Sequence, residues 1–577
     1  MEKIYYDVVI IGGGIAGLRA ALEIAANCKS KVSIAVMSKY HPLRSHSVVA
    51  GGGISGALWV GDSPELHAWD TIKGGDFLCD QDAVEMFTQL APKEIIKLEH
   101  WGVPWERNKD GTLQNAQRMG GHSFPRAVFV GDRTGHFIVQ SLYERCLMYD
   151  NIEFLNDHFA MSIVVSGDKV NGLTALDIKR GIIVGIKVRA IVIATGGLGR
   201  IYRTTTNEDQ NTGDGMVLAY KIGVPLKDME FVQFHPTGLV PHGYLITEAA
   251  RGEGGYLINA KGERFMKRYA PERQELAPRD IVSRSIMFEI MEGRGFETQD
   301  KLGYVLLDLR HLGEDVINER LSNVKETTMT LLDLDPAKDP IPVRPSEHYM
   351  MGGIHVDNHG RTCVKGLWAA GEVACVSIHG ANRLGTNALT ECVVYGMLVG
   401  RDVADYLEKD GQTSTSASTP ASDTLKEDMD NNEDKILELL SRKDGESIYK
   451  IRRSLWAIMD EYVSVIRSRE GLETALSKIK QLQERFTKAY LGDGNRYYNT
   501  SLINALELEN MLILAELITI SAINRNESRG AHYRADFPKR DDVNWLKHTL
   551  IFYSKEGPKL SYIPVRITRW HPTERKY

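Results

Sequence analysis

The chain has 577 residues, of which 43% are hydrophobic and 25% are charged. A single hydrophobic core rarely exceeds about 300 residues, so this length predicts several compact units. The net charge of −6 excludes the strongly basic surface that nucleic-acid binding requires, and we expect no nucleic-acid partner. No apolar run reaches the roughly 20 residues of a membrane-spanning helix, so we expect any membrane association to depend on a partner.

The first expected elements are a strand over residues 7–11 and a helix over residues 18–24, joined by a glycine-rich turn. Gly12, Gly14 and Gly17 occupy the first, third and sixth positions of this turn. In a dinucleotide-binding motif these glycines permit the tight turn, the approach of the backbone to a pyrophosphate and the packing of helix on strand. The helix N-terminus then attracts the phosphates. The pattern therefore predicts a nucleotide-binding domain.

The second expected strand, residues 32–37, ends in Ser38 and Lys39. An acidic residue usually binds a nicotinamide ribose at this place, so the pair disfavours NAD and is compatible with FAD. His46 follows shortly afterwards, just before three consecutive glycines. A histidine in this position is able to bond covalently to a flavin.

The dinucleotide-binding signals occur in two separate blocks. We expect residues 1–233 and 346–410 to form one discontinuous domain, because strand-and-turn patterns recur at residues 191–197 and 366–372. The intervening residues 234–345 are expected to form an inserted capping domain over the flavin. The predicted fold class is α/β: a Rossmann-like FAD-binding domain with an α+β capping domain, a helical bundle and a small C-terminal domain.

Beyond residue 410 the pattern changes twice. Residues 411–422 are small, polar and of low complexity, which indicates a flexible linker. Residues 425–530 have helical periodicity, with one apolar face over residues 448–462 and a second long helix over 501–523, and predict an antiparallel bundle. The remaining residues, 531–577, are expected to form the small C-terminal domain.

The six cysteines are scattered and form no Cys-x-x-Cys pair. This spacing argues against a disulfide framework, a zinc site or an iron–sulfur cluster, and we expect no metal site in the chain. The first strand follows almost directly on Met1, which leaves no room for a signal or transit peptide. We therefore expect the protein to remain in the reducing compartment where it is made.

Several polar clusters interrupt the apolar pattern. They are residues 44–47, 211–215, 233–237, 247–248, 251–255, 278–280, 348–353 and 379–383. Their order and composition closely resemble the flavoprotein subunit of succinate dehydrogenase and fumarate reductase. The resemblance covers almost the whole chain, including residues 528–532 and 540–542, so it is far more specific than any single motif.

The resemblance implies a site for a four-carbon dicarboxylate. His348 and Arg383 would bind one carboxylate, and His235 and Thr247 would bind the other. Burying two negative ends requires such cationic or hydrogen-bonding groups at both.

The resemblance also implies that an arginine, here Arg279, is the acid or base for proton transfer at the substrate carbon. Arginine stays protonated in almost any site, so this role needs a relay. Glu248 and Arg251 match the residues that conduct protons in the family. The alternative, that Arg279 only anchors substrate charge, stays open at this point.

For the cofactor, the resemblance implies FAD bound covalently through a ring nitrogen of His46. The other expected cofactor contacts are Gly12, Gly14, Gly17, Ser38, Lys39, Ser45, Ser47, Gly52, Gly53, Asp214, Glu372, Ala388 and Leu389. The sequence departs from the family pattern at Ser47, which replaces threonine, at Gly51, which replaces an acid or amide, at Met119, which replaces an aromatic residue, and over residues 386–390. These departures put in doubt the side-chain contacts at positions 51, 119 and 388.

The expected activity is therefore interconversion of succinate and fumarate, with electrons passed to an iron–sulfur subunit and through membrane anchor subunits to quinone. We expect a peripheral location on the cytoplasmic side of the cell membrane. The enzymatic alternatives are L-aspartate oxidase, which normally lacks the linking histidine, and a soluble fumarate reductase. A flavin-binding assembly component without turnover is the alternative from another class.

Overall fold

The computed structural model describes residues 2–28, 32–115, 120–410 and 423–575. Its centre is a parallel sheet of five strands in the order β18-β10-β2-β3-β6. The strands are β2 (Val8–Ile11), β3 (Ile34–Met37), β6 (Ile152–Leu155), β10 (Ala190–Ile193) and β18 (Leu367–Ala369). Fully buried runs of valine and isoleucine, as in β2, are typical of parallel sheets covered by helices. The predicted α/β class with a Rossmann-like sheet is confirmed.

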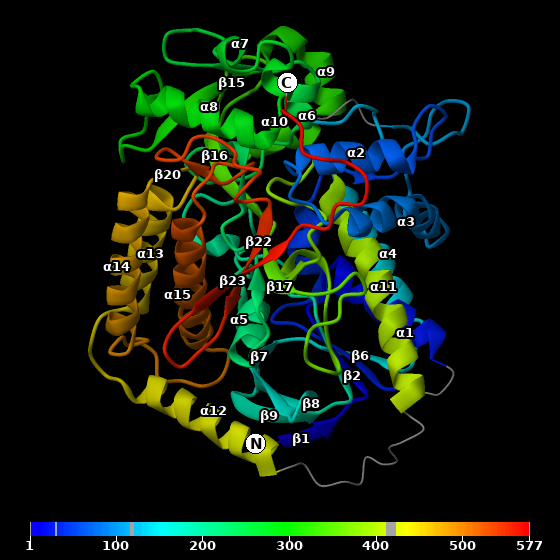
Figure 1. The fold of residues 1–577 in the computed structure, drawn as a ribbon, viewed down its shortest axis with the longest axis vertical. Coiled ribbons are helices and arrows are strands. Elements are labelled where there is room, and N and C mark those ends of the chain that lie inside the picture. The colour runs from blue at the N-terminus through cyan, green and yellow to red at the C-terminus, as the bar shows by residue number, and fades with distance from the viewer. Residues whose placement is uncertain (1, 29–31, 116–119, 411–422, 576–577) are drawn as a thin grey trace.

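Helices α1 (Ile15–Asn27) and α11 (Asn387–Asp410) pack against each other beside this sheet (Figure 1). Two glycines of α11 make the close approach possible. A methyl group at Gly396 would lie 2.7 Å from the carbonyl oxygen of Ala16, and one at Gly400 would lie 2.7 Å from that of Ala20. The helix pair therefore requires residues without side chains at these crossing points.

A second sheet lies near the N-terminus, at the lower end of the molecule in Figure 1. Its order is β1 (Glu2–Tyr5), β9 (Ile182–Lys187), β8 (Lys169–Asp177) and β7 (His158–Ser166). Helix α4 (Thr134–Cys146) packs against α1 at the side of the central sheet.

The segment expected to cap the flavin forms the upper part of the molecule in Figure 1. Its antiparallel sheet has the order β12 (Val232–Leu239), β16 (Ile341–Met350), β15 (Gly303–Asp308) and β13 (Tyr256–Ile258). Helix α8 (Arg279–Met291) packs against β12, and α9 (Glu314–Arg320) and α10 (Ser322–Leu332) pack against each other. The expected domain boundaries at 233/234 and 345/346 fall inside β12 and β16, so both strands run from one side of the boundary to the other.

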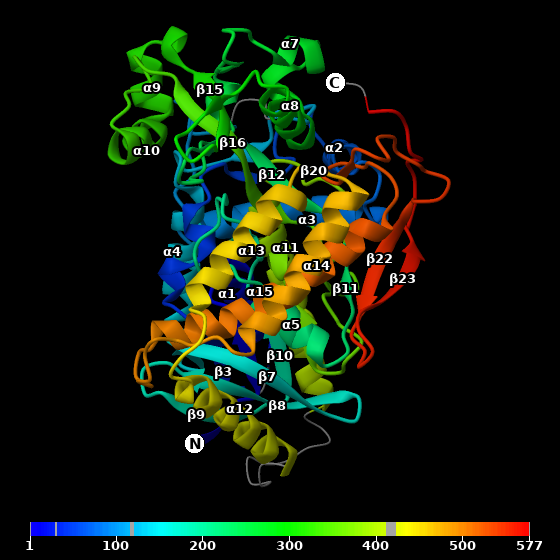
Figure 2. The same ribbon diagram turned by 90° about the vertical axis from the view of Figure 1, so that its left-hand side faces the viewer.

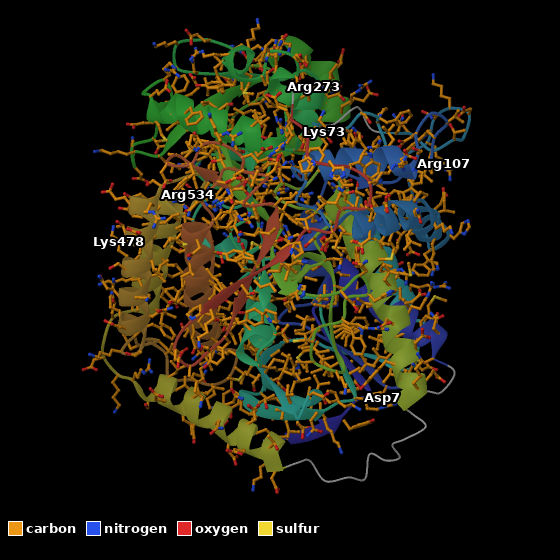
Figure 3. The ribbon with its side chains drawn as sticks, viewed as in Figure 1. Asp7, Lys73, Arg107, Arg273, Lys478 and Arg534 are labelled. Carbon is orange, nitrogen blue, oxygen red and sulfur yellow. The ribbon has the colours of Figure 1, made fainter. Side chains whose placement is uncertain are left out.

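The helical region contains α12 (Asp423–Ser441), α13 (Ile448–Tyr462), α14 (Arg469–Phe486) and α15 (Thr500–Asn524). The predicted apolar face of α13 is confirmed, since Ile448, Ile451, Leu455, Ile458 and Met459 are buried. The two long helices of the prediction are both present. Charged residues of α14 such as Lys478 lie at the outer edge of the molecule (Figure 3).

Helix α12 lies across the sheet of β7, β8 and β9 (Figure 2), and Lys435 on it forms an ion pair with Glu509 on α15. The expected linker over residues 411–422 lies outside the described residues.

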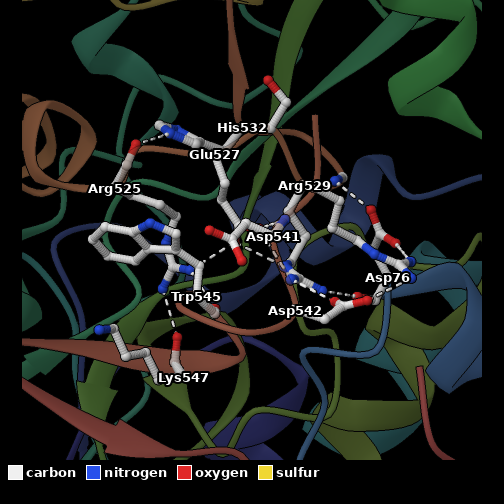
Figure 4. Close-up of polar contacts among 12 residues, drawn as sticks. Asp76, Arg525, Glu527, Arg529, His532, Asp541, Asp542, Trp545 and Lys547 are labelled. Atoms are coloured by element: carbon white, nitrogen blue, oxygen red, sulfur yellow. Dashed lines mark hydrogen bonds and ion pairs between the residues drawn. The ribbon is translucent and has the colours of Figure 1, made fainter. Parts of the chain in front are cut away.

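The C-terminal residues share a sheet with the FAD-binding region. Strand β22 (Lys547–Phe552) pairs with β23 (Lys559–Pro564) on one side and with β11 (Leu226–Lys227) on the other. A buried ionic network adds to this attachment (Figure 4). Glu527 accepts hydrogen bonds from Arg525 Nη1 (2.9 Å) and Arg529 Nε (2.8 Å), and Arg529 Nη1 donates to the carbonyl oxygen of Asp76 (2.9 Å). The tail motif at residues 528–532 is therefore structural.

Replacing Glu527 by alanine should lower the free energy of unfolding by about 3–5 kcal/mol, because the buried Arg525 and Arg529 lose their shared carboxylate. Glu438 provides a matched control: its side chain is 68% exposed and pairs with Arg442. Exposed pairs contribute about 1 kcal/mol or less. Urea unfolding of the two variants measures the difference, and equal losses would contradict the role of the network.

Candidate active site

The glycine-rich turn between β2 and α1 forms one wall of an elongated cavity with about 950 Å3 of space, part of it open to solvent. Gly12 has φ +119°, and a methyl group there would lie 2.1 Å from the carbonyl oxygen of Ala194. A methyl group at Gly17 would lie 2.0 Å from the carbonyl oxygen of Gly12. The N-terminus of α1 carries no acidic residue in its first turn, which leaves it suited to phosphate groups.

Most of the expected cofactor contacts line this cavity, which we call the trough. They are Gly12, Gly14, Ser38, Lys39, Ser45, His46, Ser47, Asp214 and Glu372. The hydroxyls of Ser45 and Thr195 are buried there, and neither has a hydrogen-bond partner within the described part of the chain. Buried polar groups are normally satisfied, so these hydroxyls fit a polar ligand such as a dinucleotide.

Two of the expected contacts are engaged within the protein itself. The Lys39 ammonium lies 2.8 Å from Asp214 Oδ2 and 2.6 Å from Glu507 Oε1 on α15. Asp214 Oδ1 accepts a hydrogen bond from Asn510 Nδ2 (2.8 Å). Lys39 and Asp214 therefore form part of the trough wall and connect it to the helical region.

His46 lies in the 3-10 helix His46–Val49, where the trough meets a second cavity. The backbone N–H of Glu208 donates to its Nδ1 (3.4 Å). Burial, with Arg200 and Arg383 nearby, lowers the pKa of His46 to about 4. The imidazole is therefore neutral near pH 7, with Nδ1 occupied as an acceptor and the proton on Nε2.

The second cavity, the substrate pocket, has about 800 Å3 of space and shares His46, Ser47, Glu372 and Cys392 with the trough. The expected residues that line it are Gly52, Gly53, His235, Thr247, Glu248, Arg279, His348, Arg383, Ala388 and Leu389. Residues from six separate stretches of the sequence thus converge beside His46. Burial raises the pKa of Glu372, which lies at the junction, to about 7.

The two histidines of the pocket lie on neighbouring strands at irregularities in their pairing. Phe234 pairs with Glu347 and Gln233 pairs with Tyr349, so His348 is the extra residue of a β-bulge in β16. Bulges redirect side chains and are frequent next to active sites. The rings of His235 and His348 lie 5.1 Å apart between centroids.

Both imidazoles are neutral, because burial and the nearby arginines hold their pKa values well below the usual range. The backbone N–H of Thr237 donates to Nδ1 of His235 (3.3 Å). The proton of His235 is therefore on Nε2, which is buried and has no partner among the residues that the structure describes. His235 is placed to donate a hydrogen bond to a ligand.

Arg279, the first residue of α8, is bound to Glu248. Its Nε and Nη2 atoms each lie 2.9 Å from Glu248 Oε2, and Glu248 Oε1 accepts a hydrogen bond from the N–H of Gly120 (2.8 Å). Burial works to raise the pKa of Glu248, but Arg279 and Arg251 outweigh it and hold the pKa at about 2. Glu248 is therefore a carboxylate at any physiological pH.

Arg251 is the one expected catalytic residue outside the substrate pocket. Its Nη2 lies 3.9 Å from Glu248 Oε2, beyond hydrogen-bond distance, and its side chain is fully buried. The residue lies at the edge of a separate hollow that is open to solvent. Arg251, Glu248 and Arg279 thus lie in this order from the hollow toward the substrate pocket.

Two further residues contact the arginines and were not expected from the sequence. Gln233 Oε1 accepts a hydrogen bond from Arg279 Nη1 (3.1 Å), and Gln233 Nε2 donates to the carbonyl oxygen of Arg383 (2.8 Å). The Arg383 guanidinium lies 4.4 Å from the centre of the Tyr349 ring. Both residues stood in the polar clusters of the sequence, but a glutamine and a tyrosine do not signal a role by themselves.

The structure describes two of the positions at which the sequence departs from the family pattern. A methyl group at Gly51 would lie 2.6 Å from the carbonyl oxygen of Asp132, so a larger residue would require that loop to move. Thr386 has φ +64°, a left-handed conformation that a β-branched residue rarely adopts. Met119 lies outside the described residues.

None of the described helices has the length and apolar character needed to cross a membrane.

Two family models match the chain: the FAD binding domain over residues 7–389 and the fumarate reductase flavoprotein C-terminal region over residues 452–577. The fumarate reductase flavoprotein subunit of Mycobacterium tuberculosis is 44% identical over 589 residues, covering 99% of each chain. The succinate dehydrogenase flavoprotein subunit of Coxiella burnetii is 42% identical, covering 97% of this chain and 96% of the other.

A solved structure of the flavoprotein chain of Escherichia coli quinol fumarate reductase, carrying one substitution, is 40% identical with a TM-score of 0.95. The match covers 100% of this chain and 99% of that chain. The chain therefore belongs to the family of fumarate reductase and succinate dehydrogenase flavoprotein subunits.

Proposed function

We propose that the chain is the FAD-containing catalytic subunit of a succinate dehydrogenase or fumarate reductase and interconverts succinate and fumarate. The observation that carries this proposal is the junction of the trough and the substrate pocket at His46. In the pocket, Arg279 and Arg383 converge with two neutral imidazoles. Glu248 pairs with Arg279, whereas Arg383 forms no ion pair among the described residues, so its positive charge suits one end of a small dianion.

The pocket residues hold the substrate at both ends in this proposal. His348 and Arg383 bind one carboxylate, and Nε2–H of His235 and the Thr247 hydroxyl bind the other. FAD, when bound, supplies the two-electron hydride acceptor. Negative charge develops on the neighbouring carbon and spreads into its carboxylate when hydride arrives at fumarate, or, in the reverse direction, when the proton leaves succinate. Fixed donors aimed at that carboxylate stabilise the transition state more than the ground state.

Arg279 exchanges a proton with the neighbouring substrate carbon. Its contact with Glu248 and the proximity of Arg251 provide a route for that proton to the solvent-facing hollow. Glu248 is a carboxylate at rest and stabilises the protonated guanidinium. In each turnover it transiently carries the proton that moves between Arg279 and the solvent side, so that both groups return to their starting charges.

His46 would hold FAD covalently through Nε2. Two features support this: the imidazole is neutral, and the N–H of Glu208 already occupies Nδ1. An electron-withdrawing link raises the reduction potential of the flavin, which favours oxidation of succinate, a weak reductant.

Electrons leave this chain for an iron–sulfur subunit. That subunit docks on membrane anchor subunits, through which the electrons are exchanged with quinone. The flavoprotein subunit itself lies on the cytoplasmic side of the cell membrane. The family membership and the match to a chain of a quinol fumarate reductase support this assembly.

The test is succinate-dependent reduction of an artificial dye by the purified holoprotein, together with in-gel flavin fluorescence after denaturation. We expect activity with succinate, none with L-aspartate, and flavin that stays with the denatured chain. Oxidation of L-aspartate with release of free flavin would favour L-aspartate oxidase. Absence of any succinate-dependent reduction would favour a non-catalytic flavin-binding role. Purification of the native complex without an iron–sulfur subunit would favour a soluble fumarate reductase.

A further inference from the structure

A buried carboxyl group, Glu347, lies next to the substrate pocket and has no role in the reaction proposed above. It precedes His348 on β16, and its side chain is fully buried. Its Oε2 accepts a hydrogen bond from the Thr205 hydroxyl (2.7 Å), whereas Oε1 has no partner among the described residues. A buried carboxyl group without a paired cation is costly when ionised, so its presence calls for an explanation.

Glu347 is attached to the loop of residues 204–208 through both its backbone and its side chain. The N–H of Glu347 donates to the carbonyl oxygen of Thr204 (2.9 Å), and the N–H of Thr206 donates to the carbonyl oxygen of Glu347 (2.9 Å). The Thr205 hydroxyl donates to the carboxyl group and accepts from the N–H of Asn207 (3.0 Å). The backbone of Glu347 thus makes two hydrogen bonds to the loop, and its side chain makes a third at Thr205.

The same loop contacts two of the three imidazoles of the site, those of His348 and His46, each at Nδ1. The Thr206 hydroxyl lies 2.7 Å from Nδ1 of His348, and the N–H of Glu208 donates to Nδ1 of His46 (3.4 Å). Contact at Nδ1 fixes the ring orientation and leaves Nε2 of each histidine for its ligand. One loop therefore orients the histidine expected to bind substrate and the histidine expected to bind flavin.

We propose that Glu347 is a positioning residue: through its hydrogen bond with Thr205, it fixes the 204–208 loop and through it the rings of His348 and His46. The proposal deepens the proposed function and rests on it, because it concerns the two histidines of that site. No contact of Glu347 with substrate or flavin is involved.

The surroundings of Glu347 favour its neutral form. Burial is the main cause that raises its pKa to about 8, and the hydrogen bond from Thr205 opposes this shift. Two charged groups face it: Glu372, from the 3-10 helix Gly371–Val373, raises the pKa further, and Arg200, from the 3-10 helix Gly199–Ile201, lowers it.

The pH dependence follows from the direction of this shift. The pKa of Glu347 in the folded protein lies above its ordinary value of 4.5. The neutral carboxyl group therefore stabilises the folded protein fully below about pH 4.5, and this stabilisation is lost as the pH rises through about 8. The loop contacts should weaken over the same alkaline range.

The test compares Glu347→Ala, Glu347→Gln, Thr205→Val and Thr206→Val in the holoprotein, with three readouts: KM for succinate, the fraction of covalent flavin, and the pH profile. Glu347→Ala and Thr205→Val should raise KM about tenfold, the effect of one lost hydrogen bond, and should both lower covalent flavin. Glu347→Gln should retain both properties at pH 7 and abolish the decline in activity above about pH 8. Thr206→Val should raise KM alone, because the bond to His46 is unaffected.

Glu446→Ala is the control, since Glu446 pairs with Arg485 on the helical region and should leave all three readouts unchanged. Wild-type KM and flavin attachment in both Glu347→Ala and Thr205→Val would overturn the proposal. An unchanged alkaline decline in Glu347→Gln would also overturn it. If the wild-type protein does not oxidise succinate, the proposed function fails, while the flavin readout still tests the loop.

Discussion

Replacing Arg279 by glutamine should lower kcat for succinate oxidation on the order of a thousandfold. Glutamine keeps a polar group of similar length, but it cannot carry the proton that Arg279 exchanges with Glu248 and the substrate. Loss of a positioned acid or base costs about 10²- to 10⁴-fold in rate. Flavin content should stay unchanged, because Arg279 does not line the trough. Steady-state dye reduction by the purified holoprotein measures the loss.

Arg320→Gln is the matched control for this prediction. Arg320 pairs with Glu253, and its side chain is half exposed, so its loss should change kcat less than about twofold. If Arg279→Gln kept a tenth or more of the wild-type kcat, Arg279 would only anchor substrate charge. The proton would then come from another group.

Replacing His46 by serine should leave FAD bound but no longer covalently attached. Oxidation of succinate should fall at least tenfold, while reduction of fumarate should change only a few-fold. The reason is the reduction potential of the flavin, which falls when the electron-withdrawing link is lost. For a two-electron couple, each fall of about 30 mV shifts the equilibrium roughly tenfold against succinate oxidation.

Both rates and the flavin potential can be measured on one preparation of the His46→Ser variant. Ser63→Ala, which removes the hydroxyl at the N-terminus of helix α2 (Pro64–Gly74), controls for loss of a polar group away from the junction. A His46→Ser variant that oxidises succinate as fast as wild type would contradict the role of the link. Flavin that remained covalently bound in this variant would place the link elsewhere.

The local parts of the fold could be predicted from the sequence. The turn at Gly12, the buried face of α13 and the strand–turn pattern at residues 366–372 are properties of short segments. Periodicity and backbone conformation determine such segments, and each has a direct signature in the residues. The substrate residues could be named because their motifs resemble those of a known family, and the structure gathers them in one pocket.

The remaining features depend on contacts between distant segments. Thr205 and Glu347 are 142 residues apart, and their hydrogen bond leaves no pattern in either segment. The same is true of Lys39 and Glu507, 468 residues apart, whose ion pair places Lys39 in the trough wall with its charge already neutralised. The pairing of β22 with β11 likewise joins the tail to the FAD-binding region. Such pairings are set by tertiary packing, which local propensity does not encode.

The most direct measurement is a crystal structure of the flavin-loaded chain with fumarate bound. The account predicts one carboxylate within about 3 Å of Arg383 and His348 and the other at the same distance from His235 and Thr247. It also predicts continuous density from Nε2 of His46 to the flavin. A dicarboxylate bound outside this pocket, or a His46 ring turned away from the flavin, would contradict the account.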